Sequence, residues 1–536
     1  MSKNLGVFYT PHELVEFVKL QLEKTIDFSK VNSILEPSAG DGRFIESILK
    51  MIPEDKLNIK LIEIDTESCR KLREKFVPKY KNIVVNNDDF LFSKLEKRKY
   101  DLIIGNPPYI SKSRLEREQI TQLRNILTEF DIPHSADKNI WTSFILKCER
   151  ALSIDGVMTF VLPFDLLQVK FSESIQNFLE RNFERIDIYT FQSLVFRAAG
   201  QDTVLLVAHK RHKSPGLYIY DVDSITKEKR SNEPLLLTRQ ACRKSTAKSN
   251  GVKWSSLVLS DCDIEFLNSL YTKLSLVDNY LISRPGLVTA ANDFFIIDSE
   301  RLQEFGLQSF SKPVVQKGLY VKNKLVFSKR DYDELIDTGL PGFFLDFNNY
   351  TQGTSSQVDE YLAFGEQLGI HNRFKCRNRE FWYKVPMVPP GDGFFFKRSS
   401  EYPKLLKNES KVYSTDSAYN IFVKLGYDIN SVIYSYYNPL TMCFAELFGR
   451  YYGGGVLELI PSEFKRLPLP YTSISLQEFE SFKKDFDEKS SIVDILDKYG
   501  RFILKDALCI SDSDIDRILI IYRSLVNRRL NKSITR

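Results

Sequence analysis

The sequence predicts an α/β protein with a doubly wound parallel sheet in its first half and a mixed α+β domain behind it. Its 536 residues exceed the usual size of a single hydrophobic core, so two domains are expected. Between residues 33 and 48 an apolar strand, "SILEP", turns through small residues into a helix, as in the first βα turn of an open sheet. Further apolar strands follow, and each ends in polar or aromatic residues.

The composition is that of a globular chain, with 43% apolar and 27% charged residues. A net charge of +5 is compatible with a polyanionic partner but does not by itself indicate one. The seven cysteines form no C-x-x-C pair and have no histidine at ligand spacing, so we expect reduced thiols and no metal site. No apolar leader and no membrane-length apolar run are present, which predicts a cytoplasmic protein without membrane association.

The first predicted helix lies in "YTPHELVEFVKLQLEKT". Thr10 is the predicted N-cap, Pro11 the first helical residue and Glu13 the partner that completes a capping box. One face of this helix is apolar at helical spacing: Leu14, Val15, Val18 and Leu22.

The first strand is followed by the small residues Ser38–Gly42, which let a ligand approach the backbone. The third glycine of the dinucleotide pattern is missing and Phe44 would crowd its place, so a nicotinamide cofactor is not expected. The second strand, "NIKLIEI", ends in Glu63, about 20 residues after Gly42, the spacing at which an acid reaches a ribose hydroxyl. Such an acid is also common as a plain strand-end residue.

The third strand, "NIVVNN", leads to Asp88, Asp89 and Phe90. This pattern offers an acceptor for an adenine amino group beside an aromatic wall. Because the carboxyl ends of parallel strands meet at one edge of a sheet, these residues are expected to lie near Glu63 and the small-residue turn.

The fourth strand, "DLIIG", ends in Asn106-Pro107-Pro108-Tyr109. Prolines lack N–H donors and fix the backbone, so this loop presents mainly carbonyl acceptors. The Asn106 amide oxygen and the Pro107 carbonyl can converge on one NH2 group, and the Tyr109 ring can stack on a planar substrate. A strand-terminating turn with a core tyrosine is the plain alternative. The position of the loop at the predicted binding edge favours a catalytic role.

Residues 6 to 210 resemble the gamma-class adenine-N6 DNA methyltransferases, whose cofactor is S-adenosylmethionine. "FYTPHELVEFV" resembles the helix before the cofactor turn, "ILEPSAGDGRF" the glycine loop, "LIEID" the ribose-binding strand end, "DDF" the adenine site and "GNPPYI" the catalytic loop. The resemblance implies a Rossmann-like sheet, with cofactor-binding residues Thr10, Glu36, Ser38, Ala39, Gly40, Gly42, Glu63, Ile64, Asp89, Phe90 and Asn106.

The catalytic residues implied by this resemblance are Asn106, Pro107 and Tyr109. "SLVFRAAGQDTVLLVAHK" resembles the segment whose aromatic residue stacks on the target base together with Tyr109. That residue would be Phe196, which on local sequence alone fits a core position equally well.

The resemblance implies direct methyl transfer, without metal or covalent enzyme intermediate, to an adenine flipped out of duplex DNA. It also implies a bacterial or archaeal type II restriction-modification enzyme or an orphan methyltransferase. We expect a monomer with no nuclease ahead of the first helix, and a separate cognate restriction endonuclease is compatible with that arrangement. Three alternatives stay open: an RNA adenine methyltransferase, a glutamine methyltransferase of the release-factor type, and a non-enzymatic DNA-binding specificity subunit.

The second half begins after a polar, basic stretch, and we place the boundary near residue 248. This gives a catalytic domain over 1–248 and a target-recognition domain over 249–536. In "HNRFKCRNREFWYKVP" cations alternate with aromatic residues, which predicts a strand with its basic residues on one face, suited to DNA phosphates or guanine edges. A solvated edge strand is the alternative. The predicted DNA contacts are Arg373, Lys375, Arg377, Arg379, Lys397, Arg398, Lys465 and Arg466.

The last predicted helix, "DSDIDRILIIYRSLVNRR", carries an apolar packing stripe. We interpret Arg523, Arg528 and Arg529 as its solvated carboxyl-terminal face.

Overall fold

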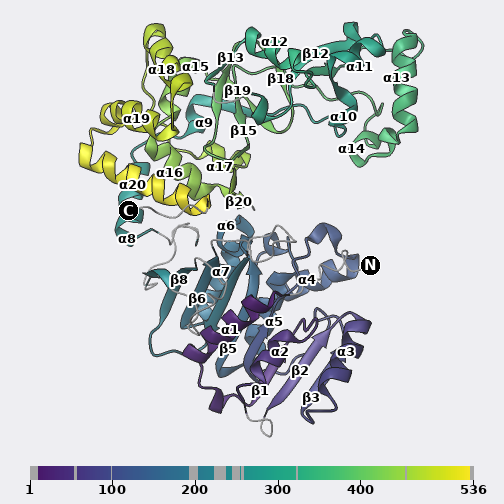
Figure 1. Ribbon diagram of the computed structural model, residues 1–536, viewed down its shortest axis with the longest axis vertical. Helices are drawn as coiled ribbons and strands as arrows, with labels where there is room; N and C mark the ends of the chain where they lie inside the picture. The colour runs from purple at the N-terminus through teal and green to yellow at the C-terminus, as the bar shows by residue number, and fades with distance from the viewer. Residues whose placement is uncertain are drawn as a thin grey trace, which may run out of the picture. The chain divides into compact units, whose positions relative to one another are not determined.

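The computed structural model describes residues 10–52, 57–97, 99–191, 203–222, 237–243, 254, 259–321, 324–452 and 455–530 (Figure 1). The chain divides into two compact units, Met1–Ile264 and Glu265–Arg536. The predicted boundary near residue 248 lies outside the described residues, so it stays a prediction.

The first unit is built on a sheet with the described strand order β3-β2-β1-β4-β5-β7-β6-β8-β9. Strands β3, β2, β1, β4 and β5 are mutually parallel, while β7 lies antiparallel between β5 and β6. The strands are β1 (Ser33–Glu36), β2 (Asn58–Glu63), β3 (Ile83–Asn87), β4 (Tyr100–Gly105), β5 (Leu152–Pro163), β6 (Arg185–Phe191), β7 (Thr203–His209), β8 (Gly216–Val222) and β9 (Leu237–Arg243).

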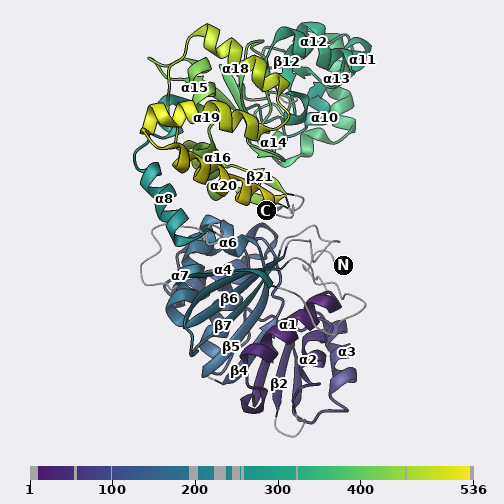
Figure 2. The same ribbon diagram turned by 60° about the vertical axis from the view of Figure 1, so that its left-hand side comes forward.

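Helices cover both faces of this sheet (Figure 2). Apolar side chains of α1, α2 and α3 form one core with one face, and those of α4, α5, α6 and α7 form a second core with the other. The doubly wound α/β fold is thereby confirmed. The helices are α1 (His12–Thr25), α2 (Arg43–Ile48), α3 (Thr66–Phe76), α4 (Arg117–Glu129), α5 (Trp141–Ala151), α6 (Asp165–Gln168) and α7 (Glu173–Asn182). The division between the two units falls within α8 (Asp261–Tyr271).

The start of α1 differs from the prediction. Pro11 is the N-cap, the helix begins at His12, and no side chain caps it. Thr10 does not cap the helix because both its hydroxyl and its carbonyl are engaged elsewhere: they accept hydrogen bonds from Asn106 and Arg43. The predicted capping box with Glu13 is therefore wrong, and the segment before α1 is tied to the ligand-binding edge of the sheet instead.

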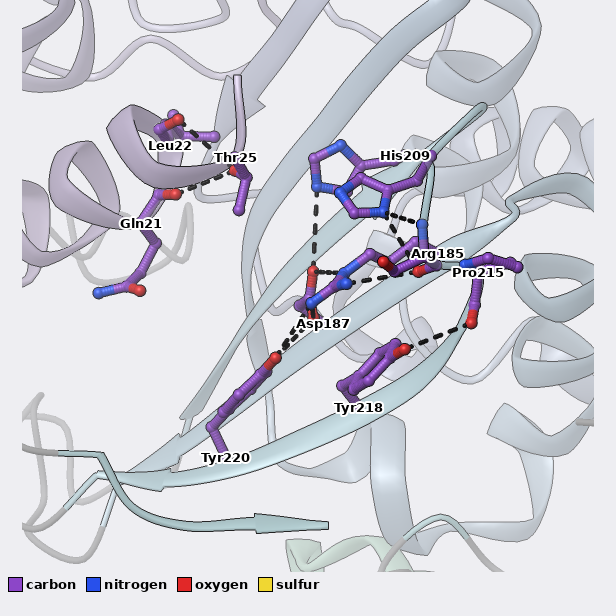
Figure 3. A network of polar contacts seen from close by, with 11 residues as sticks. Gln21, Leu22, Thr25, Arg185, Asp187, His209, Pro215, Tyr218 and Tyr220 are labelled. Carbon is purple, nitrogen blue, oxygen red and sulfur yellow. Dashed lines mark hydrogen bonds and ion pairs between the residues drawn. The ribbon is translucent and has the colours of Figure 1, made fainter. Parts of the chain in front are cut away.

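A buried polar network joins β6, β7 and β8, level with the middle of β5 (Figure 3). The Asp187 carboxylate accepts two hydrogen bonds from the Arg185 guanidinium, at 2.8 and 2.9 Å, and one from the Tyr220 hydroxyl at 3.1 Å. His209 Nε2 lies 3.9 Å from Asp187, but burial lowers the pKa of His209 to about 3 and the imidazole is neutral at physiological pH. The network satisfies a buried carboxylate and fixes the strand register.

The second unit contains three small described sheets, ordered β10-β19-β15-β17-β13, β11-β14-β12-β18 and β16-β21-β20. This is the predicted mixed α+β architecture. The strands are β10 (Leu281–Pro285), β11 (Ile296–Ile297), β12 (Ser311–Val315), β13 (Val326–Phe327), β14 (Phe343–Leu345), β15 (Gly393–Phe396), β16 (Arg398–Ser399), β17 (Leu405–Asn408), β18 (Tyr413–Ser414), β19 (Ala418–Val423), β20 (Arg450–Tyr452) and β21 (Val456–Glu458).

Helices of the second unit flank these sheets, and α16, α19 and α20 pack against one another. Within the described residues no helix combines the length and apolar character needed to cross a membrane. The helices are α9 (Val277–Tyr280), α10 (Asn292–Phe295), α11 (Ser299–Glu304), α12 (Lys329–Asp337), α13 (Ser356–Gln367), α14 (Phe374–Arg377), α15 (Ile429–Tyr436), α16 (Pro439–Phe448), α17 (Pro461–Lys465), α18 (Leu476–Glu488), α19 (Ile492–Leu508) and α20 (Asp512–Arg529).

Two local predictions for this unit are wrong. The segment predicted as a basic strand instead forms the short helix α14, because Cys376 is fully buried at its centre and the chain turns around it. At the end of α20, Arg529 is buried rather than solvated. Its guanidinium donates to both carboxylate oxygens of Glu446, at 2.8 and 2.9 Å, and to backbone carbonyls that satisfy its other N–H groups.

Candidate functional site

A cavity of about 560 Å³ lies where β1, β2, β3 and β4 end. This is the edge at which open α/β sheets bind ligands. Most residues predicted for cofactor binding and catalysis line it: Thr10, Glu36, Ser38, Ala39, Gly40, Glu63, Ile64, Asp89, Phe90, Asn106, Pro107 and Tyr109.

The small-residue turn after β1 shapes the floor of the cavity. Gly40 has φ +54°, and a Cβ added there would meet nothing within 4 Å, so its backbone is open to a ligand. Gly42, also predicted to bind the cofactor, is not among the described residues that line the cavity, and a Cβ there would lie 2.6 Å from Phe76 and 2.7 Å from Leu72 of α3. Gly42 therefore permits helix packing beneath the turn.

Glu63 fastens the turn to the end of β2. Its two carboxylate oxygens accept hydrogen bonds from the backbone amides of Gly40, at 2.7 Å, and Asp65, at 2.9 Å. Each carboxylate oxygen has a second lone pair, so the group can still accept hydroxyl donors from a ligand.

Glu36 is a carboxyl group with an unusual environment at the end of β1. It is 1% exposed, and among the described residues its Oε2 atom has no hydrogen-bond partner. Burial, together with the nearby charges of Asp41 and Glu63, raises the pKa of Glu36 well above its usual value. Burial thus favours the neutral form of this carboxyl in the ligand-free protein, and a cation placed beside it would favour its ionisation.

An aromatic wall closes the cavity at the end of β3. The Phe90 ring stacks on Phe144 of α5, with ring centroids 4.4 Å apart and planes 28° from parallel. The Asp89 carboxylate accepts hydrogen bonds from the Leu91 amide and from the Gln119 side chain of α4, both at 2.9 Å. Together these residues offer a flat apolar surface beside an oriented acceptor.

The Asn106–Tyr109 loop is tied to both neighbouring segments. The Ser38 hydroxyl donates to the Asn106 backbone carbonyl at 3.1 Å, and the Asn106 side-chain Nδ2 donates to the Thr10 hydroxyl at 3.3 Å. The second contact directs the Asn106 amide nitrogen toward Thr10, so the amide oxygen points away from Thr10. Burial of the Tyr109 hydroxyl raises the pKa of Tyr109 well above its usual value, so this ring stays neutral.

Several residues at the cavity were not identified from the sequence. Phe144 and Gln119 come from helices whose periodicity indicates only packing, and their roles depend on tertiary contacts with Phe90 and Asp89. Arg43, which pairs with Asp41 at 2.6 Å, also lines the cavity. Phe196, the predicted second stacking residue, lies outside the described residues.

The predicted DNA contacts fall on several elements of the second unit. Arg373, Phe374, Lys375 and Arg377 are exposed on and beside α14. Arg379 differs from them: its guanidinium donates to the carbonyls of Val288, Thr289 and Trp382 at 2.8 to 3.2 Å, which holds the loop before α10. The remaining predicted contacts lie on or beside β15, β16 and α17: Lys397, Arg398, Lys465 and Arg466.

All four of these cations lie close to partners within the second unit, and Arg466 lies 5.0 Å from the Phe448 ring centroid. Arg398 pairs with Glu458 at 3.3 Å, and Lys465 pairs with Asp278 at 3.4 Å. Lys397 lies 5.3 Å from the Tyr419 ring centroid. Lys375, in contrast, borders a concavity of about 660 Å³ that is also lined by Arg301, Lys317 and several amide and carboxylate side chains.

Comparison with known proteins gives matches to both halves of the chain. Residues 14–196 match the family model "Eco57I restriction-modification methylase", and residues 251–504 match "Type II methyltransferase M.Eco57I, C-terminal domain". Type II methyltransferase M.AccI of Acinetobacter calcoaceticus is 21% identical over 87% of this chain and 85% of its own length. Type II methyltransferase M.HincII of Haemophilus influenzae is 24% identical, over 69% and 70%.

A solved structure, the type IIG restriction endonuclease BpuSI, is 16% identical and aligns with 98% of this chain and 66% of its own, with a TM-score of 0.41. The fold assignment rests on the strand order described above and not on that likeness. Both halves of the chain are thus similar to type II restriction-modification methyltransferases.

Proposed function

We propose that the protein transfers the methyl group of S-adenosylmethionine to the N6 amino group of an adenine flipped out of duplex DNA. The observation that carries this proposal is that the Asn106–Tyr109 loop lines the same cavity as Glu63, Asp89 and Phe90, which are suited to bind the ribose and adenine of an adenosine group. Methylation of DNA within restriction-modification is the activity named for the relatives. The adenine specificity rests on the chemistry of the loop.

The residues present fit the cofactor. A cavity of about 560 Å³ is within the usual range for sites of drug-sized ligands. Glu36 would face the ammonium group, Glu63 the ribose hydroxyls, and Asp89 with Phe90 the adenine ring. When bound, S-adenosylmethionine supplies an electrophilic methyl group on a sulfonium centre. Ile64, which is 46% exposed at the cavity, would cover the ring from the side opposite the β3 loop.

The catalytic task of the chain is to help a weak nucleophile, adenine N6, attack the methyl group. The exocyclic nitrogen of adenine is weak because its lone pair is delocalised into the ring. By accepting both N6 hydrogens, the Asn106 amide oxygen and the Pro107 carbonyl would favour a tetrahedral nitrogen and orient its lone pair. The Thr10 and Ser38 contacts fix Asn106 for this role before substrate arrives.

A base in a duplex cannot reach such a cavity, so the target adenine must leave the stack. Tyr109 is proposed to stack on one face of the flipped base, and Phe196 stays the predicted partner on the other. The exposed cations of α14 are proposed to contact DNA phosphates or base edges. A monomer in the bacterial or archaeal cytoplasm, paired with a separate cognate restriction endonuclease, completes the proposal.

The test is transfer of labelled methyl from S-adenosylmethionine to mixed-sequence duplex DNA, single-stranded DNA and total RNA, followed by nucleoside analysis. N6-methyladenine in duplex DNA is the expected product. Methyl in RNA alone, in protein amides alone, or in another DNA base would contradict the proposal. Absence of transfer with retained DNA binding would indicate a specificity subunit.

A further inference from the structure

Lys147 of α5 lies behind the wall of the cavity that is formed by residues 89–93. Its ammonium donates hydrogen bonds to the backbone carbonyls of Phe90, of Leu91 at 3.0 Å and of Ser93 at 2.8 Å. Three donors meet three acceptors, so the ammonium is satisfied by a single loop. The same nitrogen lies 4.6 Å from the centroid of the Phe90 ring.

This arrangement is unusual for a lysine, because no carboxylate among the described residues lies within ion-pair distance of it. Four titratable groups act on it electrostatically: Asp88 and Asp89 on the loop, Glu129 at the end of α4, and the adjacent Cys148. Burial outweighs them and lowers the pKa of Lys147 to about 8. A charged side chain has thus been partly desolvated to hold backbone carbonyls in place.

The loop that Lys147 holds is the one that carries the proposed adenine-binding residues. Phe144, one turn earlier on α5, stacks on Phe90, so this helix fixes the loop through a ring and through an ammonium. Helix α4 contributes two amides: Gln119 donates to the Asp89 carboxylate, and Gln122 donates to the Leu91 carbonyl at 3.2 Å. Among the side chains that the structure describes, Lys147 alone binds three carbonyls of the loop at once.

We propose that Lys147 is a positioning residue for cofactor binding, which sets the backbone of residues 89–93 so that Asp89 and Phe90 meet the adenine ring. The inference rests on the proposed S-adenosylmethionine site and extends it to a residue that does not touch the ligand. Loss of the ammonium weakens adenine binding, while the Asn106 loop and the transfer step at saturating cofactor are unaffected.

Two variants distinguish the effect of the Lys147 hydrogen bonds from the effect of its side-chain volume. Lys147→Met keeps the length and apolar stem of the side chain and removes every donor, whereas Lys147→Arg keeps the charge. Arg150→Met is the matched control on the same helix, because Arg150 pairs with Glu129 and covers the Phe130 ring, 4.0 Å away, without contacting the loop. Thermal melting of each variant checks that it is folded.

The probe is 5′-methylthioadenosine, which carries the adenosine part of the cofactor and no amino-acid part, with S-adenosylmethionine measured in parallel. Calorimetry at pH 7 should show about tenfold weaker binding of both ligands to Lys147→Met, the ratio expected if the displaced loop costs the ligand one hydrogen bond to Asp89. Lys147→Arg should recover most of the affinity, and Arg150→Met should bind as the wild type does. The kcat for methyl transfer at saturating cofactor should change less than about twofold in Lys147→Met.

A pH series distinguishes this role from general packing. Above pH 8 the neutral amine has one donor fewer, so wild-type affinity for methylthioadenosine should fall by pH 9.5 while that of Lys147→Met stays level. If the wild type binds both ligands and Lys147→Met binds them equally well, the inference is overturned while the cofactor assignment stands. Parallel pH profiles in the two proteins would have the same meaning. Failure of the wild-type protein to bind either ligand would overturn the cofactor assignment and the inference with it.

Discussion

Cofactor binding should release a proton from Glu36. The structure holds this carboxyl 1% exposed, with one oxygen that has no partner among the described residues, beside the charges of Asp41 and Glu63. Its pKa is raised, so the folded, ligand-free protein keeps this proton to a higher pH than the unfolded chain does. The folded state is accordingly disfavoured as pH rises from the unfolded pKa toward the folded one. Glu36→Gln removes this dependence and should stabilise the ligand-free protein at pH 7.

The magnitude follows from linkage. An ammonium group placed beside Glu36 favours the carboxylate, so binding shifts the carboxyl toward its ionised form and releases up to one proton. At pH values between the pKa of Glu36 in the bound protein and its pKa in the free protein, the association constant for S-adenosylmethionine should rise tenfold for each pH unit. This is about 1.4 kcal/mol of binding free energy per unit. Glu36→Gln should lose this slope and bind the cofactor more weakly, because the amide cannot ionise.

The assay is calorimetry at pH 6.5 in two buffers with different ionisation enthalpies. At this pH an α-amino group, with a pKa of about 7.7 to 8, is still mainly charged. Wild-type protein with S-adenosylmethionine should release protons, and Glu36→Gln close to none. 5′-Methylthioadenosine, which has no ammonium, is the ligand control and should release none from either protein. Equal proton release by the wild type and Glu36→Gln would refute the assignment of Glu36 to the ammonium.

Two further predictions concern the second unit. Lys375→Ala with Arg377→Ala should weaken duplex DNA binding and reduce the slope of log K against log salt by about 2, at roughly 0.9 for each phosphate that is no longer neutralised, with cofactor affinity unchanged. Arg529→Met should lower the free energy of unfolding by about 3 kcal/mol in urea titrations, because the buried Glu446 carboxylate loses its partner.

Each of these has a matched control. Lys329→Ala with Arg330→Ala removes two cations of α12 that pair with acids one turn later, and the salt slope should not change. Arg523→Ala alters an exposed residue of α20 and should change stability by less than about 0.5 kcal/mol. A normal salt slope in the α14 double variant would exclude that segment from the DNA interface, and a near-neutral Arg529→Met would show that Arg529 is not needed to stabilise Glu446.

Much of the first unit could be predicted because its signals are local. Apolar strands, the small-residue turn and the two consecutive prolines each fix the backbone within a few residues, and parallel topology then brings the strand ends together. The positions of Glu36, Glu63, Asp89 and Asn106 around one cavity follow from that topology. The same local patterns could not reveal Lys147, because its role depends on carbonyls more than 50 residues away in the chain.

The second unit was harder to predict for the same reason. Alternating cations and aromatic residues fit a strand as well as a short helix, and burial of Cys376 decided in favour of α14. Arg379 and Arg529 are basic residues in basic stretches, yet each binds backbone carbonyls inside the fold. Whether a basic side chain binds a DNA phosphate or a carbonyl of the protein depends on tertiary packing, which cannot be predicted from composition.

The central claim is that the Asn106–Tyr109 loop performs the transfer and does not merely shape the cofactor cavity. Single-turnover methyl transfer and equilibrium S-adenosylmethionine affinity, measured side by side for wild type and Asn106→Ala, test it most directly. The account predicts at least a roughly 100-fold loss of the transfer rate, as for removal of one preorganised polar group, with cofactor affinity within about twofold. Retained transfer, or equal losses in rate and affinity, would contradict it.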